Sequence, residues 1–336
     1  MTFDERVRAL EPLRLTERQA RFVVTVALHS GYCLRRQYMA FAGLRYGRVV
    51  RHFLDHLVAR QLAVRERCRA DRGYLYHLQA RSIYRALGQE DNRNRRAASL
   101  AAIGRKLMLL DFVIAHPDAE WLATEDDKVE FFTSRLGVPL AALPRQTYAA
   151  YDERTSPSTR YFAQKLPIFV AGHPPVVHFV TLALDTSGDG FERFLRDHAR
   201  LLSHVPSWAI DVVGPAESAV ALAACRRVFD RHALSPQSHS LPTAADVSRH
   251  FAIRRSLEQN DVTRVSIADL NWFRESRPRF ANSIMEARFA RWLVDGDRAL
   301  ADDTTASRRP DIGIGRIVAH SLPFSYQQFG DFAGVC

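Results

Sequence analysis

Lysine is nearly absent from this chain of 336 residues, in which three lysines stand against 44 arginines. A GC-rich genome favours arginine codons, so the number of arginines alone is weak evidence for phosphate binding. The distribution of charge along the chain is stronger evidence, because codon bias acts on every part of a sequence alike. The three lysines are Lys106, Lys128 and Lys165.

Cysteine is also scarce, and long apolar runs are missing. No two cysteines have the C-x-x-C spacing of a zinc or redox site, so we expect reduced thiols that pack in a cytoplasmic protein. No stretch approaches 18 uninterrupted apolar residues, and residues 1–14 lack the apolar core of a signal peptide, so we expect no membrane contact. The cysteines are Cys33, Cys68, Cys225 and Cys336.

The usual catalytic and metal-binding motifs are missing too. The 13 histidines form no H-E-x-x-H or other compact ligand set, so we predict no metal and no cofactor. No G-x-S-x-G elbow is present, and Cys225 lies within a predicted amphipathic helix, where it is expected to pack. We therefore predict no catalytic residue.

Positive charge is concentrated at the start of the chain. Residues 1–96 carry 20 arginines, no lysine and nine acidic groups, a net charge of +11, whereas residues 97–336 carry 27 basic and 28 acidic groups, a net charge of −1. A basic module joined to a neutral body is typical of nucleic-acid-binding proteins. We predict a DNA-binding domain over 1–96, a helical linker or dimerisation region over 97–158, and an α/β domain for an effector, a partner or dimerisation over 159–336.

Apolar spacing and turn residues predict the elements of the first domain. Thr16 is a candidate N-cap, Gly31 and Gly43 can end helices, and residues 70–73 can form the turn of a hairpin. Helices are expected over 16–31, 34–42, 48–60 and 80–87, with strands over 62–69 and 74–78. This order is that of a winged helix-turn-helix domain, in which the third helix enters the major groove of double-stranded DNA and the hairpin lies along the backbone.

The candidate DNA contacts follow from that geometry. Arginine can bind guanine with two hydrogen bonds or pair with phosphate, so the same side chains suit base reading and backbone contact. Winged helices also serve as protein-interaction modules, and that alternative stays open. The candidates near the second and third helices are Arg35, Arg36, Arg45, Tyr46, Arg48, Arg51 and His52. Those of the hairpin are Arg65, Arg67, Arg69 and Arg72.

Residues 14–88 also resemble a known group of proteins. The run LTERQARFVVTVALHSGYCLRRQYMAFAG, followed by GRVVRHFLDHLVARQLAVRER and GYLYHLQARSIYRALG, is similar to the winged helices of MarR-type regulators. It is more particularly similar to the replication-relaxation family of plasmid and integrative-element proteins. The resemblance implies a bacterial DNA-binding protein linked to a mobile genetic element.

The rest of the chain predicts a mixed α/β body. Residues 89–96 are polar and are expected to form an exposed connection or the start of a helix. Strands and helices alternate after residue 166, which favours a partly parallel sheet. Helices are expected over 97–116, 124–135, 190–205, 216–232 and within 243–296, and strands over 166–171, 176–184 and 208–213. Residues 139–158 are expected to wrap the surface, and the last forty residues to form a loop or tail. The predicted fold class is a winged helix-turn-helix joined to a mixed α/β domain.

A nuclease is the enzymatic alternative. Pro117-Asp118 and Asp126-Asp127-Lys128 superficially match a PD-(D/E)xK arrangement, but their spacing is short and Thr124 reads as the start of a helix. The loop after Asp185 lacks a P-loop lysine and is expected to be a helix-capping turn. The tyrosines that could suggest a relaxase nucleophile lack an accompanying histidine set; they are Tyr148, Tyr151 and Tyr161.

Taken together, these patterns favour a cytoplasmic bacterial transcriptional regulator that binds specific double-stranded DNA as a homodimer. A protein partner or a small effector would bind the C-terminal domain. The alternatives are a DNA-processing enzyme, either a nuclease or a relaxase-like protein, and a non-catalytic assembly factor for plasmid replication, conjugation or defence.

Overall fold

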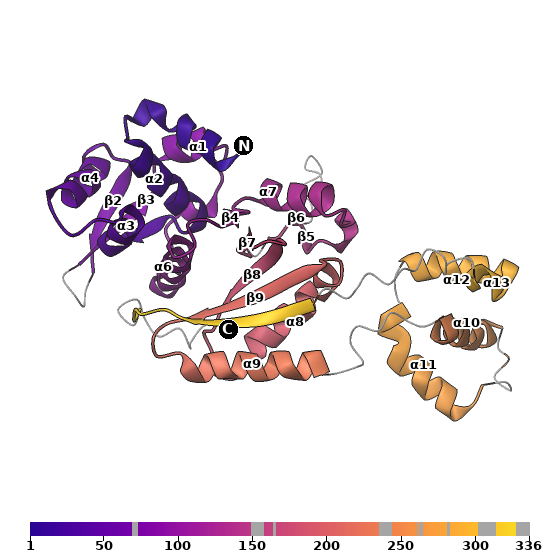
Figure 1. The fold of residues 1–336 in the computed structure, drawn as a ribbon. Helices are drawn as coiled ribbons and strands as arrows, with labels where there is room; N and C mark the ends of the chain where they lie inside the picture. The colour runs from indigo at the N-terminus through magenta and orange to yellow at the C-terminus, as the bar shows by residue number, and fades with distance from the viewer. Residues whose placement is uncertain are drawn as a thin grey trace. The chain divides into compact units, whose positions relative to one another are not determined.

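The chain has a mixed helix-and-strand fold made of two compact units (Figure 1). The computed structural model describes residues 1–68, 73–148, 158–163, 166–234, 244–259, 261, 265–280, 283–301 and 314–326. Unit 1 comprises Met1–Arg231 and Gly313–Cys336, and unit 2 comprises His232–Ile312. The predicted segments 1–96 and 97–158 therefore both fall within unit 1, together with part of the third.

The N-terminal part of unit 1 contains every regular element that the sequence predicts there, each within a few residues of the expected bounds. A short helix and a short strand, α1 and β1, are additional. The elements are α1 (Phe3–Ala9), a 3-10 turn (Glu11–Leu13), α2 (Glu17–His29), β1 (Tyr32–Leu34), α3 (Arg35–Ala42), α4 (Arg48–Ala59), β2 (Ala63–Arg67), β3 (Tyr74–Leu78) and α5 (Arg81–Ala86).

Local signals explain these elements. Thr16 caps α2 in a capping box, because its hydroxyl accepts from the Gln19 amide and the Gln19 side chain accepts from the Thr16 amide. Strand β3 pairs antiparallel with both β1 and β2, in the order β1-β3-β2. The helices enclose a core in which the rings of Phe22, Tyr38 and Phe53 pack against one another.

The segment 89–96, predicted as an exposed connection or a helix start, is exposed at Asp91, Arg93 and Arg96 but is anchored at Asn94 between α2 and α6 (Leu100–Ile114). Asn94 is 2% exposed, and its side-chain amide donates to the carbonyls of Ala27 and Leu28. Its side-chain oxygen accepts from Lys106 on α6. A Cβ at Gly31 would lie 2.2 Å from the Asn94 carbonyl oxygen, so only glycine allows this close approach. A polar residue can thus mark a buried hydrogen-bonded junction as well as a surface loop.

The body of unit 1 is built on a five-stranded sheet of order β10-β9-β8-β7-β4. Strands β8, β9 and β10 are parallel, and β7 runs antiparallel to β8 and β4, so the expected partly parallel sheet is confirmed. The strands are β4 (Glu120–Trp121), β7 (Ile168–Ala171), β8 (Val176–Leu182), β9 (Ser207–Gly214) and β10 (Ile314–Ser321). The helices are α6, α7 (Glu125–Glu130), continued by a π-helical turn (Phe131–Arg135), a 3-10 turn (Leu140–Ala142), α8 (Asp189–Leu202) and α9 (Ala219–Leu234).

Helices cover both faces of this sheet. Phe112 on α6 packs with Phe169 and Val213, whereas Phe191 on α8 and Val228 on α9 belong to the core of the opposite face. The sheet strands alternate accordingly, with successive residues facing the two cores. The N-terminal part is joined to α6 directly, since the Gln37 side chain donates to the Leu107 carbonyl.

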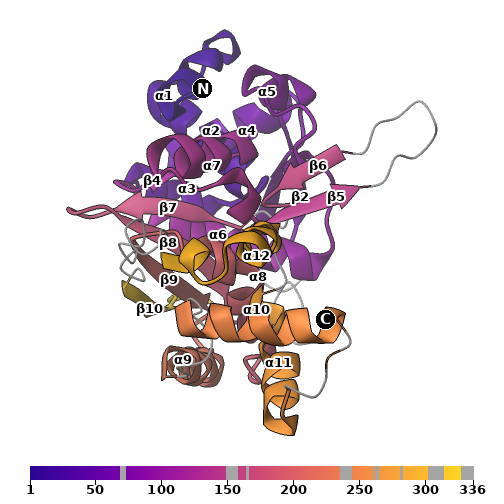
Figure 2. The same cartoon turned by 90° about the vertical axis from the view of Figure 1, so that its right-hand side faces the viewer.

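Two segments contain strands that the sequence does not predict. Arg145–Tyr148 is exposed, as expected for the surface segment 139–158, of which residues 149–157 lie outside the described residues. Within 139–158, β5 (Arg145–Tyr148) pairs antiparallel with β6 (Ser158–Tyr161), and Figure 2 shows these two strands side by side at the edge of unit 1. Within the last forty residues, β10 pairs with β9 along eight residues. The partner of β10 lies about a hundred residues earlier in the chain, beyond the reach of any local pattern, and a polar segment precedes the strand.

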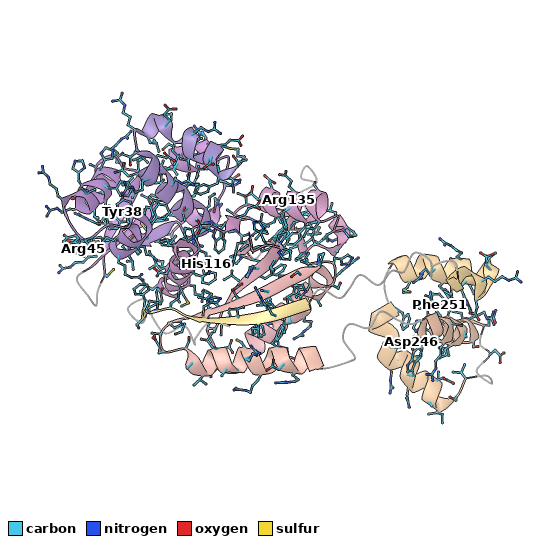
Figure 3. The ribbon with its side chains drawn as sticks, viewed as in Figure 1. Tyr38, Arg45, His116, Arg135, Asp246 and Phe251 are labelled. Atoms are coloured by element: carbon cyan, nitrogen blue, oxygen red, sulfur yellow. The ribbon has the colours of Figure 1, made fainter. Side chains whose placement is uncertain are left out.

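Unit 2 is helical, as predicted for 243–296, and is inserted between α9 and β10. Its own aromatic core includes Phe251, which Figure 3 labels, and the rings of Phe289 and Trp292 contact it. Throughout the described ranges, none of the helices combines the length and the apolar composition that crossing a bilayer requires. The helices of unit 2 are α10 (Ala244–Glu258), α11 (Ile267–Phe280), α12 (Ser283–Asp295) and α13 (Arg298–Ala301).

Candidate nucleic-acid interface

Helix α4 presents one apolar and one basic face. Its apolar face is made by Val50, Phe53, Leu54 and Leu57, each at most 1% exposed. Arg48, Arg51 and His52 are exposed on the other side, in agreement with the helical period. Within the described residues, no ion pair or hydrogen bond joins the side chain of Arg48 or Arg51 to another group. Two guanidinium groups on one face are therefore available to an outside partner.

The turn before α4 extends this basic face. Arg45 and Tyr46 are exposed, Tyr46 to 56%, and Figure 3 shows Arg45 on the outer side of the N-terminal helices. The guanidinium of Arg35, at the start of α3, lies 4.3 Å from the centre of the Tyr46 ring. This cation–π contact holds a cation and an aromatic ring side by side at the N-terminal end of α4.

The β2–β3 hairpin contributes two further arginines. Arg65 and Arg67 are exposed on β2. Arg65 pairs with Asp55 of α4 at 3.2 Å and lies 4.7 Å from the centre of the Tyr74 ring. Both partners of this ion pair are about half exposed, so the pair adds little stability but orients the hairpin against α4. Arg69 and Arg72 lie outside the described residues.

Arg36 does not belong to this surface. Its guanidinium binds the Asp111 carboxylate of α6 through two hydrogen bonds of 2.5 and 2.7 Å and lies 3.6 Å from the centre of the Phe324 ring. The Tyr326 hydroxyl donates to the same carboxylate, which is 6% exposed. The prediction of Arg36 as a DNA contact is corrected accordingly, because its charge is used inside unit 1.

Two exposed apolar or aromatic groups on this surface escaped the sequence analysis. Val49 on α4 is 63% exposed between Arg48 and the buried Val50, and Tyr74 at the start of β3 is 39% exposed. An apolar side chain on a recognition helix can contact a thymine methyl group. The sequence could have predicted that Val49 is exposed, because a helical step of 100° from the buried Val50 turns its side chain outward.

The acids of the possible nuclease motif have other partners. Asp127 accepts two hydrogen bonds from Arg6, at 2.9 and 2.8 Å, and caps α7 together with Thr124. Burial acts to raise the pKa of Asp127, but the bonds from Arg6 and Thr124 outweigh it and hold that pKa below its usual range. Asp118 is exposed before β4, and the Lys128 side chain is buried.

The loop after Asp185 is a hydrogen-bonded acidic turn, as the sequence predicts, but Gly188, the N-cap residue of α8, makes no side-chain capping hydrogen bond. The Asp185 carboxylate accepts from the Ser187 hydroxyl at 2.8 Å and from the Gly188 amide at 2.7 Å, directly before α8. Among the residues with described positions, no group of three histidine, cysteine or acidic side chains is arranged to hold a metal ion.

A cluster of two histidines around one aspartate lies on three neighbouring strands. Asp211 on β9 bonds the Nδ1 atom of His178 on β8 and the Nε2 atom of His320 on β10, each at 2.6 Å. Burial opposes ionisation of Asp211, but the two imidazoles hold its pKa below the usual range. The His178 ring stacks on Phe169 under α6, so the cluster links three strands in the sheet face that α6 covers. Its members are far apart in the sequence, so only the fold reveals it.

No family model, curated protein or solved structure matches this chain. The resemblance of residues 14–88 to MarR-type and replication-relaxation proteins therefore stays a prediction.

Proposed function

We propose that residues 1–96 form a winged helix-turn-helix that binds double-stranded DNA. The observation that carries this proposal is the pair of exposed arginines on α4, which have no ion-pair partner among the described residues, next to a hairpin that carries two further exposed arginines. In a winged helix, α4 would be the recognition helix and β2–β3 the wing. The order of the elements and the net charge of +11 over 1–96 support the same assignment.

Binding would divide into two parts. Arg65 and Arg67 on the hairpin suit phosphate contacts, which supply affinity through counterion release. Arg48, Val49 and Arg51 on α4 suit the major groove, where arginine pairs with guanine and an apolar side chain contacts thymine. The protein would therefore bind most DNA weakly and prefer sites that match the side chains of α4.

The test compares the substitutions Arg48→Ala and Arg51→Ala with Arg227→Ala, an exposed arginine of α9 in the body. Affinity is measured over a series of salt concentrations, on a fragment from upstream of the protein's own coding sequence and on a shuffled fragment. We expect each α4 variant to bind the upstream fragment about tenfold or more weakly, since a lost arginine–base pair costs about 1–3 kcal/mol. A lost phosphate contact would instead lower the slope of log K against log salt by about 0.9.

The control variant should bind as the unaltered protein does, because it removes the same charge from a different surface. Unchanged affinity and salt slope in both single α4 variants and in their double variant would refute the assignment of α4 to DNA. Equal binding to the two fragments would contradict sequence preference, while leaving DNA binding itself intact.

The wider proposal is a cytoplasmic bacterial transcriptional regulator of a mobile genetic element, acting as a homodimer on an inverted repeat. Two-fold symmetric half-sites about one helical turn apart are the usual targets of such modules. Footprinting checks this, because a regulator protects a promoter in two symmetric blocks. A single block at an origin would instead favour the assembly factor.

A further inference from the structure

Unit 1 contains a cavity of about 1200 Å³ on a side of the molecule that the proposed DNA surface does not use. Its lining comes from the end of α2, residues 88–96, α6, α7, β6, β8 and α8, and none of the α4 or β2 arginines belongs to it. Binding pockets for small molecules usually have volumes of about 300–1000 Å³. The cavity is therefore large enough for a ligand of nucleotide size.

The two described lysines both line this cavity, in a chain that otherwise uses arginine. The Lys106 ammonium donates to the Ser30 carbonyl at 3.0 Å and to the Asn94 side-chain oxygen at 2.9 Å, both neutral acceptors. Burial lowers the pKa of Lys106 to about 8. An ammonium has three N–H donors, so Lys106 can still bind one further acceptor.

Lys128 is more deeply buried, at 5% exposed. Its ammonium lies 5.6 Å from the centre of the Phe162 ring, and no hydrogen bond or ion pair joins it to any described residue. Burial lowers its pKa to about 8 although Asp127 and Glu125 act in the opposite direction. Because Lys128 lines the cavity and its ammonium has no acceptor among the described residues, an anion in the cavity could pair with it.

The acids of the lining do not neutralise these cations. Glu90 is paired with Arg85 at 3.1 Å, and Glu125 lies 3.8 Å from Arg160 and accepts from the Tyr161 amide at 2.7 Å. The other two acids, Asp91 and Asp126, are exposed at the rim. Arg105 of α6 is half-buried in the lining and is not paired with any acid in the described ranges.

Apolar and aromatic side chains also line the cavity, among them Phe162, Leu166 and Phe194. One carboxylate could balance only one of the cations Arg105, Lys106 and Lys128. A phosphate or diphosphate carries two or more charges and several acceptor oxygens in one compact group. The apolar and aromatic side chains would then contact an organic portion, and the volume leaves room for it.

We propose that this cavity binds a small organic phosphate of nucleotide size, with its phosphate groups on Arg105, Lys106 and Lys128 and its organic portion against Phe162 and Phe194. The site is separate from the α4 surface. A bound ligand would contact both the N-terminal part, through residues 88–96, and the sheet body, through β8 and α8.

The experiment titrates the full chain with ATP, with pyrophosphate and with uncharged adenosine, by calorimetry and by the shift in thermal unfolding. We expect ATP to bind one site per chain, pyrophosphate to bind the same site more weakly, and adenosine to bind least. Lys128→Met and Arg105→Gln should each weaken ATP binding by about tenfold or more, because each removes a hydrogen bond between charged groups.

The matched control is the double variant Arg48→Ala/Arg51→Ala, which removes two exposed positive charges from the other surface. It should bind ATP as tightly as the unaltered chain. Absence of binding by both ATP and pyrophosphate at millimolar concentration would overturn the proposal, as would binding that Lys128→Met and Arg105→Gln leave unchanged. Loss of ATP binding in the control would assign the nucleotide to the basic DNA surface instead. Because none of these readouts uses DNA, failure here is distinct from failure of the proposed function.

Discussion

Arg36 stabilises the junction of α3, α6 and the segment after β10, whereas its neighbour Arg35 is exposed. The terminal nitrogens of the Arg36 guanidinium bind the Asp111 carboxylate, and the guanidinium also lies against the Phe324 ring. The pair is protected from solvent mainly on the Asp111 side, which is 6% exposed against 31% for Arg36. Of these two adjacent arginines, Arg36 therefore stabilises the interior of unit 1, whereas Arg35 lies on its surface.

We predict that Arg36→Met destabilises unit 1 by about 3–5 kcal/mol, because it leaves the Asp111 charge buried without its cationic partner. Urea unfolding followed by tryptophan fluorescence measures the change. Arg35→Met is the matched control and should cost less than about 1 kcal/mol, since only an exposed cation–π contact is lost. Equal effects of the two substitutions would contradict the assigned roles.

At the residue scale, the sequence predicts which side chains are exposed better than it predicts which groups those side chains bind. Arg48, Arg51 and His52 are exposed as the helical period of α4 requires. Arg36 follows no such rule, because its partner Asp111 is 75 residues away and becomes visible only when α3 packs on α6. The Asp211 cluster was missed for the same reason, since its hydrogen bonds span 33 and 109 residues.

At the scale of single elements, glycine allows β9 and β10 to pair where a large ring lies between them and α9. Gly315 on β10 is directly opposite Trp208 on β9, and a Cβ at Gly315 would lie 2.2 Å from two carbons of the indole ring. The Trp208 ring packs edge-on against Phe229 of α9. A side chain at position 315 would therefore displace the indole or separate the strands.

We predict that Gly315→Ala destabilises unit 1 by about 1–3 kcal/mol, the usual cost of overpacking a well-packed core. Thermal unfolding followed by circular dichroism gives the change in Tm. Gly47→Ala serves as the comparison, because its nearest neighbouring atom lies 4.0 Å from the added Cβ. If the two substitutions lowered Tm equally, crowding at Trp208 would not be the cause.

Elements with strong local signals were the ones that sequence reasoning placed well. Helix α2 has its capping box and α4 its apolar face, and both are within three residues of their expected bounds at either end. Strand β10 and the pair β5–β6 were missed, because their evidence is a partner strand rather than a local pattern. The burial of Asn94 was missed because its polar side chain satisfies hydrogen bonds of α2 and α6 instead of facing water.

At the scale of the whole molecule, unit 2 interrupts a β9–α9–β10 crossover without belonging to it. Strand β10 returns to the sheet and pairs with β9 along its length, and residues beyond it complete the interior. His320 binds Asp211, and Tyr326 binds Asp111. Unit 2 has its own aromatic core. Unit 1 therefore includes the C-terminal strand β10 as part of its own sheet, and unit 2 has a separate core.

We predict that replacing residues 236–312 by a flexible linker of about ten residues leaves unit 1 folded, since a βαβ crossover returns the end of its helix to the edge where the next strand begins. Such a linker spans about 16–19 Å on average. Thermal unfolding and DNA binding should stay close to those of the full chain.

Truncation after residue 234 is the comparison. It removes β10 as well, exposes the β9 edge and takes a partner from both Asp211 and Asp111. That variant should lose cooperative unfolding or fail to fold. If the linker variant were as unstable as the truncation, unit 2 would have to support the sheet; if the truncation were as stable as the full chain, β10 would not complete it.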